Sequence, residues 1–387
     1  MQSLAKMDRR ALDCLRSQPR GSAWRTAPSV HPARIPRAWP RQVAHAQPAS
    51  FIPPQISEIM EPAAQAMASS MRRVPVTILT MPGSPTVATA FVGPTREEAS
   101  RYPKDAPTIV LLHGFDSSCM EWRRLHPLLA AAAPTYALDL VGWGFTDASV
   151  FASDPSLVIR PEDKAAHMRA FLEAHTDPDR PVVLVGASLG GAKALDFAHT
   201  YPELVKSVVL IDGQGFIDGI GQMSSAPRPL LWLGVKVLQS VPLRQAANKL
   251  AYHDKARFAT EDAMRIGRLH THLPGWLDAN IAFMRSGGYA ISSKISQIQQ
   301  DVLVMWGRND EILDPSYATR FQETLPRSSL VWVERCGHCA HLEQPQLAAN
   351  NILSFVGLLQ EGTTAAGEAP AEAAEAGAAV GVSAAGK

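Results

Sequence analysis

A serine flanked by glycines ends an apolar run near the middle of the chain. The segment 182–193 reads Val-Val-Leu-Val-Gly-Ala-Ser-Leu-Gly-Gly-Ala-Lys, in which Ser188 lies two residues from Gly186 and from Gly190. Glycines at this spacing allow a strand to turn sharply into a helix, because side chains at these positions would collide. The serine hydroxyl is then exposed at the strand tip, and the amide of Leu189 lies at the positive end of the helix. The segment therefore predicts a nucleophile with one oxyanion donor beside it.

A serine hydroxyl is a weak nucleophile near neutral pH, so it needs a base within reach and a carboxylate that orients this base. Candidates for both follow apolar runs further along the chain. One run ends at Trp306 and leads into Asp310, and a later run ends near Glu334 and leads into His338. Serine, acid and histidine thus occur in this order, each after a predicted strand.

Four motifs together resemble the α/β-hydrolase family, in its capped form with a serine nucleophile, over about residues 74–360. They are His113-Gly114-Phe115, Gly186-Ala187-Ser188-Leu189-Gly190, Trp306-Gly307-Arg308-Asn309-Asp310 and Cys336-Gly337-His338. The resemblance implies Ser188 as the nucleophile, His338 as the general base and acid, and Asp310 as the orienting carboxylate. It also implies an oxyanion hole formed by the backbone amides of Phe115 and Leu189. Segments 114–122, 139–147 and 266–289 are similar to plastid-targeted plant and algal members.

Other side chains compete for these roles. Asp314 is an alternative acid that we expect to cap a helix, and Asp212 ends an earlier strand, where some family members place the acid. His341 lies one turn beyond His338 and is the alternative base. We expect His341 instead to line the mouth of the pocket or to begin a helix.

The sequence Cys336-Gly-His-Cys339 has the spacing of a thiol oxidoreductase site. A thioredoxin-like domain would need further strands after this motif, whereas the chain continues into an Ala/Gly/Glu tail. Zinc binding by Cys336, Cys339 and His341 would lack a second ligand pair. We therefore expect neither a metal nor an organic cofactor, while a regulatory disulfide around His338 stays an open alternative.

Apolar runs alternate with helical patterns over the rest of the folded region. Strands are predicted at 74–81, 86–92, 108–112, 135–140, 181–185, 207–211, 302–306 and 330–334, and helices at 121–132, 161–175, 189–199, 316–325 and 345–359. Continuous Val/Ile/Leu strands separated by helices predict a mostly parallel, doubly wound sheet covered on both faces. The first two strands have no helix between them, which indicates an antiparallel edge. The predicted fold class is α/β, with the α/β-hydrolase arrangement.

The alternation breaks at residues 214–294, where a mainly helical pattern predicts a cap inserted into the core of residues 72–213 and 295–360. Apolar cap residues could line a substrate pocket, and our tentative candidates are Trp232, Trp276, Phe283 and Met284. For any single one of them, packing within the cap is the alternative. An apolar cap also allows peripheral contact with a membrane.

Residues 1–71 are predicted to be an unpacked basic leader. Eight arginines precede residue 50, against only Asp8 and Asp13 among the acids. This composition is typical of organellar transit peptides, which favours a plastid location, with the mitochondrion or a disordered extension without an address as alternatives. Residues 361–387 are almost entirely Ala, Gly and Glu and are predicted to be a disordered tail.

Composition narrows the function further. The chain of 387 residues is 46% hydrophobic with a formal net charge of +1, which gives no reason to expect nucleic acid as a partner. No apolar run is long enough for a transmembrane helix, and oligomeric state is not predicted.

The expected reaction is hydrolysis of an ester or related acyl bond of a small apolar molecule through an acyl-enzyme. Carbon–carbon bond hydrolysis, thioesterase or cofactor-free peroxidase activity, and ligand binding or signalling with slow turnover, are the alternatives.

Overall fold

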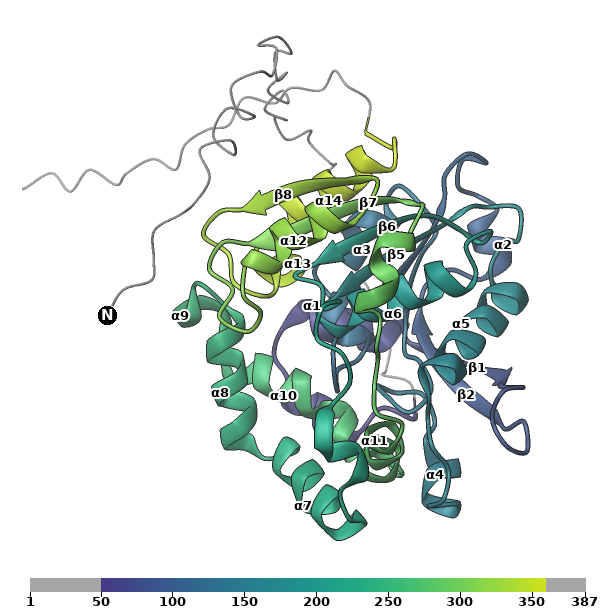
Figure 1. Cartoon of the computed structure of the whole chain (residues 1–387), viewed down its shortest axis with the longest axis vertical. Coiled ribbons are helices and arrows are strands. Elements are labelled where there is room, and N and C mark those ends of the chain that lie inside the picture. Colours follow the sequence, from purple (N-terminus) through teal and green to yellow (C-terminus); the bar gives the residue numbers. More distant parts are fainter. Residues whose placement is uncertain (1–49, 360–387) are drawn as a thin grey trace, which may run out of the picture. The chain divides into compact units, whose positions relative to one another are not determined.

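An eight-stranded sheet forms the centre of the computed structural model, which describes residues 50–359 (Figure 1). Across the sheet the strands are β1 (Arg72–Thr77), β2 (Thr86–Val92), β4 (Thr135–Leu138), β3 (Thr108–Leu112), β5 (Val182–Ala187), β6 (Val205–Ile211), β7 (Asp301–Gly307) and β8 (Ser328–Val333). Strand β2 pairs antiparallel with β1 and with β4, and all other neighbours pair parallel. The predicted fold class and its antiparallel edge are confirmed.

Helices cover both faces of the sheet because its central strands are apolar on both sides. In β3, Ile109 and Leu111 pack into one core, whereas Val110 and Leu112 pack into the other. The first core is closed by α1 (Pro62–Ser70), α3 (His126–Ala130) and α14 (Pro345–Phe355), and the second by α5 (Pro161–His175), α6 (Leu189–Thr200) and α12 (Ser316–Thr324). Every residue of β3 and β5 is buried, which holds the tip of β5 rigidly.

Residues 50–71 differ from the sequence prediction, which placed them in an unpacked leader. They form η2 (Pro54–Glu58) and α1, and their apolar side chains join the first core: Ile52, Ile56, Ile59, Ala64, Met67, Ala68 and Met71. The physical signal was present in the sequence, because the basic bias ends at Arg41 and no arginine or lysine follows before Arg72. Residues 1–49 and 360–387 lie outside the described residues.

The segment predicted as a cap lies between β6 and β7. Its elements are η4 (Gly221–Ser225), α7 (Arg228–Leu238), α8 (Val241–Ala251), α9 (Lys255–Phe258), α10 (Glu261–Leu269), η5 (His270–His272), α11 (Trp276–Arg285) and η6 (Ser292–Gln297). Helix α11 packs against α7 and α10 packs against α8, so most of these helices form one group at an end of the folded part (Figure 1).

The remaining elements are short connections: α2 (Arg96–Ala99), η3 (Cys119–Trp122), α4 (Ser149–Ser153) and α13 (Ala340–Glu343). The helix predicted at 121–132 is divided into η3 and α3, because Pro127 is tolerated in the first turn of a helix but not in its interior. Within residues 50–359, the structure contains no helix long and apolar enough to cross a membrane.

Candidate active site

Ser188 lies at the turn from β5 into α6, with φ 51° and ψ −124°. Such a backbone is strained for any residue other than glycine and persists only where the surroundings enforce it. Here a Cβ on Gly186 would overlap the carbonyl oxygen of Gly190, and a Cβ on Gly190 would overlap the carbonyl oxygen of Leu112. Both glycines are therefore required for β3, β5 and α6 to meet at this turn.

Backbone hydrogen bonds fix the position of Ser188. Its N–H donates to the carbonyl of Ile211 at 3.1 Å, and its own carbonyl accepts from the amides of Gly191 at 2.9 Å and Gln214 at 2.8 Å. Its hydroxyl, by contrast, makes no hydrogen bond with any residue in the range 50–359. The side chain that could act as a nucleophile is thus left free while its backbone is held.

The loop after β3 lies over the Ser188 side chain. A Cβ placed on Gly114 would be only 3.3 Å from the Cβ and 3.7 Å from the Oγ of Ser188. The amides of Phe115, in this loop, and Leu189, at the start of α6, have no hydrogen-bond acceptor among residues 50–359. Two unpaired donors beside a serine are the arrangement that an oxyanion hole requires.

Asp310 and His338 are brought together from the ends of neighbouring strands. Asp310 follows β7, His338 follows β8, and Nδ1 of His338 lies 2.8 Å from Oδ2 of Asp310. The other carboxylate oxygen of Asp310 accepts from the amides of Ile312 at 2.8 Å and Leu313 at 3.0 Å. A carboxylate held in this way fixes the ring, so Nε2 of His338 is the nitrogen left to exchange a proton.

The alternative acids occupy different positions. Asp314 is exposed and accepts from the amide of Ser316 at 2.8 Å at the start of α12, as expected for a cap. Asp212 follows β6 and is buried, and its Oδ1 accepts from the amide of Gly307 at 2.7 Å. Its Oδ2 is buried without a hydrogen-bond partner among the described residues.

Asp212 is nevertheless part of the same cluster. Ligand-type atoms of Asp212, Asp310 and His338 lie within 4.8 Å of one another. Burial, and then the charge of Asp310, raise the pKa of Asp212 well above its ordinary value. A cation is not needed here, because donors already engage both Asp310 oxygens and Oδ1 of Asp212.

His341, the alternative base, faces another carboxylate. Its Nε2 lies 3.2 Å from Oε1 of Glu121, and its ring packs on Trp122 with centroids 4.7 Å apart. Oε2 of Glu121 accepts from the amide of Gly114 at 3.2 Å. His341 and Glu121 therefore connect the loop after β8 with the loop after β3.

The cysteines that flank His338 are both free thiols. Burial raises the pKa of Cys336 and of Cys339, which disfavours the reactive thiolate.

Comparison of the sequence with known proteins identifies the family of this chain. The sequence pattern described as the Alpha/beta hydrolase family matches residues 109–350, which span all three predicted triad residues. The chain belongs to the α/β-hydrolase family. It is 36% identical over 308 residues to the alpha/beta hydrolase domain-containing protein VTE7 of Arabidopsis thaliana, covering 79% of this chain and 89% of that protein.

Bacterial relatives of this α/β-hydrolase include enzymes named for their substrates. The chain is 28% identical over 266 residues to 2-hydroxy-6-oxononadienedioate/2-hydroxy-6-oxononatrienedioate hydrolase 2 of Pseudomonas putida, covering 65% of this chain and 88% of that protein. Among solved structures, an esterase from Thermogutta terrifontis matches with a TM-score of 0.61 at 20% identity, over 74% of this chain and 98% of its own. The latter match shows the shared fold.

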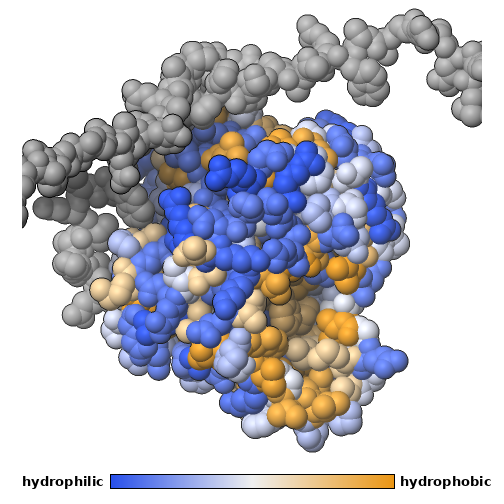
Figure 2. All heavy atoms as spheres, turned by 90° about the vertical axis from the view of Figure 1, so that its left-hand side faces the viewer, coloured by the Kyte–Doolittle hydropathy of each residue, from blue (hydrophilic) through white to orange (hydrophobic). Residues whose placement is uncertain are grey.

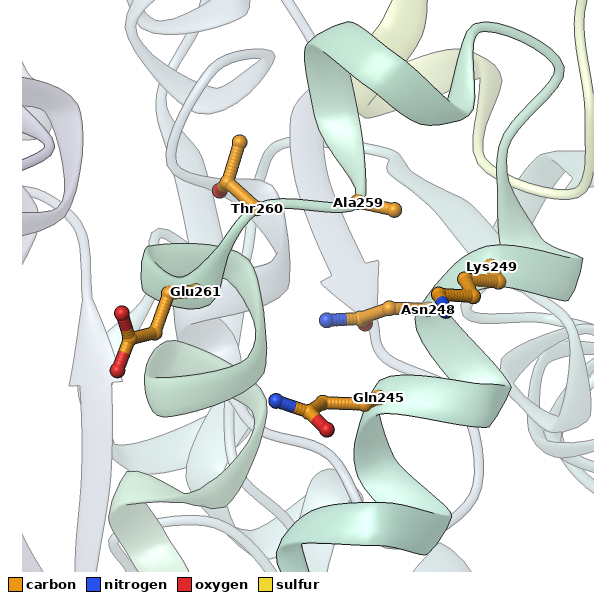
Figure 3. A pocket seen from close by; sticks show the side chains of 6 residues that line it. All are labelled: Gln245, Asn248, Lys249, Ala259, Thr260 and Glu261. Carbon is orange, nitrogen blue, oxygen red and sulfur yellow. The ribbon is translucent and has the colours of Figure 1, made fainter.

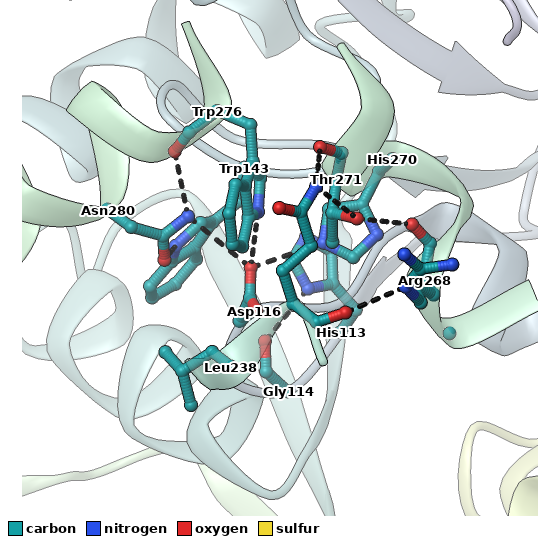
Figure 4. Close-up of polar contacts among 12 residues, drawn as sticks. His113, Gly114, Asp116, Trp143, Leu238, Arg268, His270, Thr271, Trp276 and Asn280 are labelled. Carbon is teal, nitrogen blue, oxygen red and sulfur yellow. Dashed lines mark hydrogen bonds and ion pairs between the residues drawn. The ribbon is translucent and has the colours of Figure 1, made fainter. Parts of the chain in front are cut away.

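In this α/β-hydrolase, Asp116 joins the loop after β3 to the cap (Figure 4). Its Oδ1 accepts from Nε1 of Trp276 at 2.8 Å and lies 3.2 Å from Nε2 of His270 and 3.4 Å from Nδ2 of Asn280. Its Oδ2 pairs with Arg244 of α8. Burial alone would raise the pKa of Asp116, but the hydrogen bonds and charges of these partners outweigh it and lower the pKa. An ionised carboxylate two residues from Gly114 thus binds three cap elements.

Two buried lysines of the hydrolase lie against the ring of Trp143, and one of them also contacts the loop after β3. Nζ of Lys193, on α6, donates to the carbonyl of His113 at 2.7 Å and lies 4.4 Å from the ring centre of Trp143. Nζ of Lys164 lies 3.7 Å from the same ring and donates to the carbonyl of Val141. Burial lowers the pKa of Lys193 to about 7. Lys193 therefore fixes a carbonyl of the loop that carries the Phe115 amide.

The four tentative pocket residues are not in one environment. Trp276, Phe283 and Met284 of α11 are buried, whereas Trp232 of α7 is 47% exposed. Phe283 contacts Trp143, with centroids 4.6 Å apart, and lies 6.4 Å from the ring of Phe115. Of the four, Phe283 lies near the ring of Phe115 in the loop over Ser188, and Trp276 donates to Asp116 of the same loop.

A separate pocket of about 230 Å³ lies within the cap, between α8 and the start of α10 (Figure 3). Its lining is mainly polar and comprises Gln245, Asn248, Lys249, Ala259, Thr260 and Glu261. None of the predicted site residues contributes to it.

Sequence reasoning missed Asp116, Glu121 and the loop contact of Lys193. Asp116 directly follows the His113-Gly114-Phe115 motif and is the only acidic residue of segment 106–120, which was the available signal. The partners of Asp116 lie more than a hundred residues away along the chain, at positions 244–280. No local pattern could have identified them.

Proposed function

We propose that this α/β-hydrolase cleaves an ester or related acyl bond of a small apolar molecule through an acyl-enzyme on Ser188. The observation that carries the proposal is the position of Ser188: its backbone is strained, and its hydroxyl has no hydrogen-bond partner among residues 50–359 and lies near the unpaired amides of Phe115 and Leu189. Asp310 and His338, which are hydrogen-bonded to each other, follow parallel strands of the sheet that carries Ser188, and His338 supplies the base.

In the proposed reaction, Nε2 of His338 accepts the proton of Ser188 as Oγ attacks the carbonyl carbon of the substrate. The two amides stabilise the oxyanion of the tetrahedral intermediate. His338 then gives its proton to the leaving alcohol, and an acyl-enzyme remains. Water then attacks the acyl carbon while His338 accepts its proton. His338 returns this proton to Oγ of Ser188 as the acid is released, and Asp310 orients the ring in both halves of the reaction.

An apolar substrate fits the aromatic surroundings of the loop. Phe115 and Phe283 lie near each other, and Trp143 packs between them and the buried lysines. We propose that Phe283, with Trp276 and Met284 behind it on α11, contacts the apolar part of the substrate. Trp232 is the weakest of the four candidates because its side chain faces outward.

Carbon–carbon bond hydrolysis is the second candidate, and the identity of 28% to the Pseudomonas putida 2-hydroxy-6-oxononadienedioate/2-hydroxy-6-oxononatrienedioate hydrolase favours it. The same three side chains could serve either reaction.

The test is to assay the full chain and a Ser188→Ala variant with acyl esters of increasing chain length and with a 2-hydroxy-6-oxo-dienoate. We expect ester turnover on the order of 10 per second on the best substrate, with a preference for longer acyl chains and none in Ser188→Ala. Cleavage of the dienoate without ester turnover would favour the second candidate. Absence of both reactions, with ligand-dependent protease sensitivity, would favour a binding protein.

We also propose import into a plastid, which the 36% identity to a plant protein supports. Removal of the basic leader should cut the chain before residue 50, because Ile52, Ile56 and Ile59 belong to the folded core. Sequencing the N-terminus of the protein recovered from isolated plastids and mitochondria tests both the location and this limit.

A further inference from the structure

Large apolar side chains project outward from one side of the cap. On α7, Leu230 is 60%, Leu233 56% and Val237 50% exposed, and Trp232 lies among them. Figure 2 shows such side chains gathered at the lower end of the face that it presents, where α7 lies in Figure 1. Further exposed apolar residues of the cap are Met223, Leu243 and Leu250. A surface of this kind is uncommon in a protein domain unless it contacts something.

The opposite side of α7 already has its packing partners. Leu231 and Val235 are buried against Trp276, Ile281 and Met284 of α11. Helix α7 is therefore apolar on two sides, and only one of them is needed to hold the cap together.

The charges of this segment have one sign. Residues 219–253 contain no aspartate or glutamate, and their charged residues are Arg228, Lys236, Arg244 and Lys249. The two arginines pair with Asp278 and Asp116. The two lysines have no ion-pair partner within residues 50–359, and Nζ of Lys236 lies 5.7 Å from the ring centre of Trp232.

We propose that the outer side of α7 and α8, here called the cap surface, docks onto an anionic lipid bilayer. Leucine and tryptophan side chains of an interfacial helix enter the boundary between headgroups and acyl chains, while lysines extend to the phosphates. An anionic headgroup layer attracts each free lysine, and no carboxylate of residues 219–253 opposes it.

A second copy of the chain fits the cap surface less well. A two-fold interface would place the same surface on both sides and bring Lys236 and Lys249 of each copy toward like charges. A bilayer presents no such repulsion.

The experiment measures binding of the full chain to vesicles of phosphatidylcholine, with and without phosphatidylglycerol. A Leu230→Ser/Leu233→Ser double variant and a Lys236→Glu/Lys249→Glu double variant are compared with the unmodified chain. Matched controls are Leu79→Ser, which removes an exposed leucine outside the cap, and Lys206→Glu, which reverses an exposed charge on β6. Because every variant keeps the basic residues 1–49, their attraction to the vesicles is common to all samples.

We expect either cap-surface variant to weaken partitioning onto anionic vesicles by about tenfold or more, and the controls to leave it unchanged. Brominated lipids should quench tryptophan emission in the unmodified chain, and Trp232→Phe should remove most of this quenching. Partitioning that is unaltered in both cap-surface variants would overturn the proposal. So would a dimer of the unmodified chain that Leu230→Ser/Leu233→Ser converts to a monomer in the absence of lipid.

The vesicle measurement requires no turnover, so its outcome is independent of the proposed hydrolysis. Unchanged folding of the variants is checked by circular dichroism.

Discussion

Two buried carboxylates, Asp212 and Asp310, lie beside the same imidazole, yet only Asp310 bonds it. The difference follows from the loops that carry them. The amides of Ile312 and Leu313 hold one oxygen of Asp310 and direct the other to His338. Asp212 directs one oxygen to the amide of Gly307, and burial together with the neighbouring Asp310 raises its pKa.

Replacing each carboxylate by an amide should therefore give opposite results. Asp310→Asn should lower kcat on the order of 10⁴, as in serine proteases, because an amide stabilises the wrong tautomer of the imidazole. Asp212→Asn should change kcat by less than about tenfold, because an amide is uncharged and keeps the acceptor for Gly307. The measurement is kcat on one good ester, and a dead Asp212→Asn enzyme with an active Asp310→Asn enzyme would reverse the assignment.

Lys193 should give the protein a pH-dependent stability. Burial lowers the pKa of Lys193 to about 7. Between about pH 7 and pH 10.5 the lysine is therefore mainly deprotonated in the folded state and still protonated in the unfolded state. The unfolded state then binds more protons, so this group makes the protein more stable as pH rises through that window. Lys193→Met should lose the effect, which is at most about 1.4 kcal/mol per pH unit.

Urea unfolding of the unmodified chain and of Lys193→Met, near pH 7 and near pH 9, checks this. The free energy of unfolding of the unmodified chain should rise relative to the variant at the higher pH. An identical difference at both values would show that Lys193 does not titrate there.

At the scale of elements, the loop after β3 depends on both the sheet and the cap. Glu121 and Lys193 hold it from the core, and Asp116 holds it to α8, η5 and α11. Movement of the cap would therefore displace the loop that carries the Phe115 amide.

Arg244→Met should loosen this connection. It removes the arginine that pairs with Asp116 and leaves the buried carboxylate with its partners on η5 and α11 alone, at a cost of roughly 1–3 kcal/mol. Hydrogen exchange should become faster in α8 and α11 and stay unchanged in β5 and β6. Arg257→Met, at an exposed position on α9, is the control. Uniformly faster exchange across the sheet would argue against a local connection.

The elements that sequence reasoning predicted best depend on local patterns. The strand at 86–92 and the helix at 161–175 agree with β2 and α5 because their apolar spacing and Pro161 define them without distant contacts. The turn at Ser188 was predictable for the same reason. The Asp116 cluster was not, because it depends on how the cap packs, and Glu121 was assigned to a regular helix that Pro127 prevents.

At the scale of the whole molecule, residues 50–71 complete the core. Besides their apolar contacts, Glu61 of this segment pairs with Arg123 at 3.0 Å and Arg124 at 2.8 Å. Burial raises the pKa of Glu61, but the two arginines outweigh it and lower the pKa overall. The overall basic character of residues 1–49 hid this boundary from composition.

A chain that begins at residue 50 should keep its thermal stability, whereas a chain that begins at residue 72 should be unfolded or aggregate. Burial of one large apolar side chain is worth roughly 1.5–3 kcal/mol, and the second chain loses several of them against a total stability of about 5–15 kcal/mol. Differential scanning calorimetry of both chains measures the difference. Equal melting temperatures would show that η2 and α1 are dispensable.

The central claim is that Ser188 is an activated nucleophile, and covalent labelling tests it most directly. The full chain is treated with a fluorophosphonate, and the modified residue is located by peptide mass spectrometry. Because an elbow serine beside a base and two free amides is activated, one equivalent should be incorporated at Ser188. Ser188→Ala should incorporate none, and His338→Ala should react far more slowly. Equal labelling of the unmodified chain and of Ser188→Ala would contradict the account.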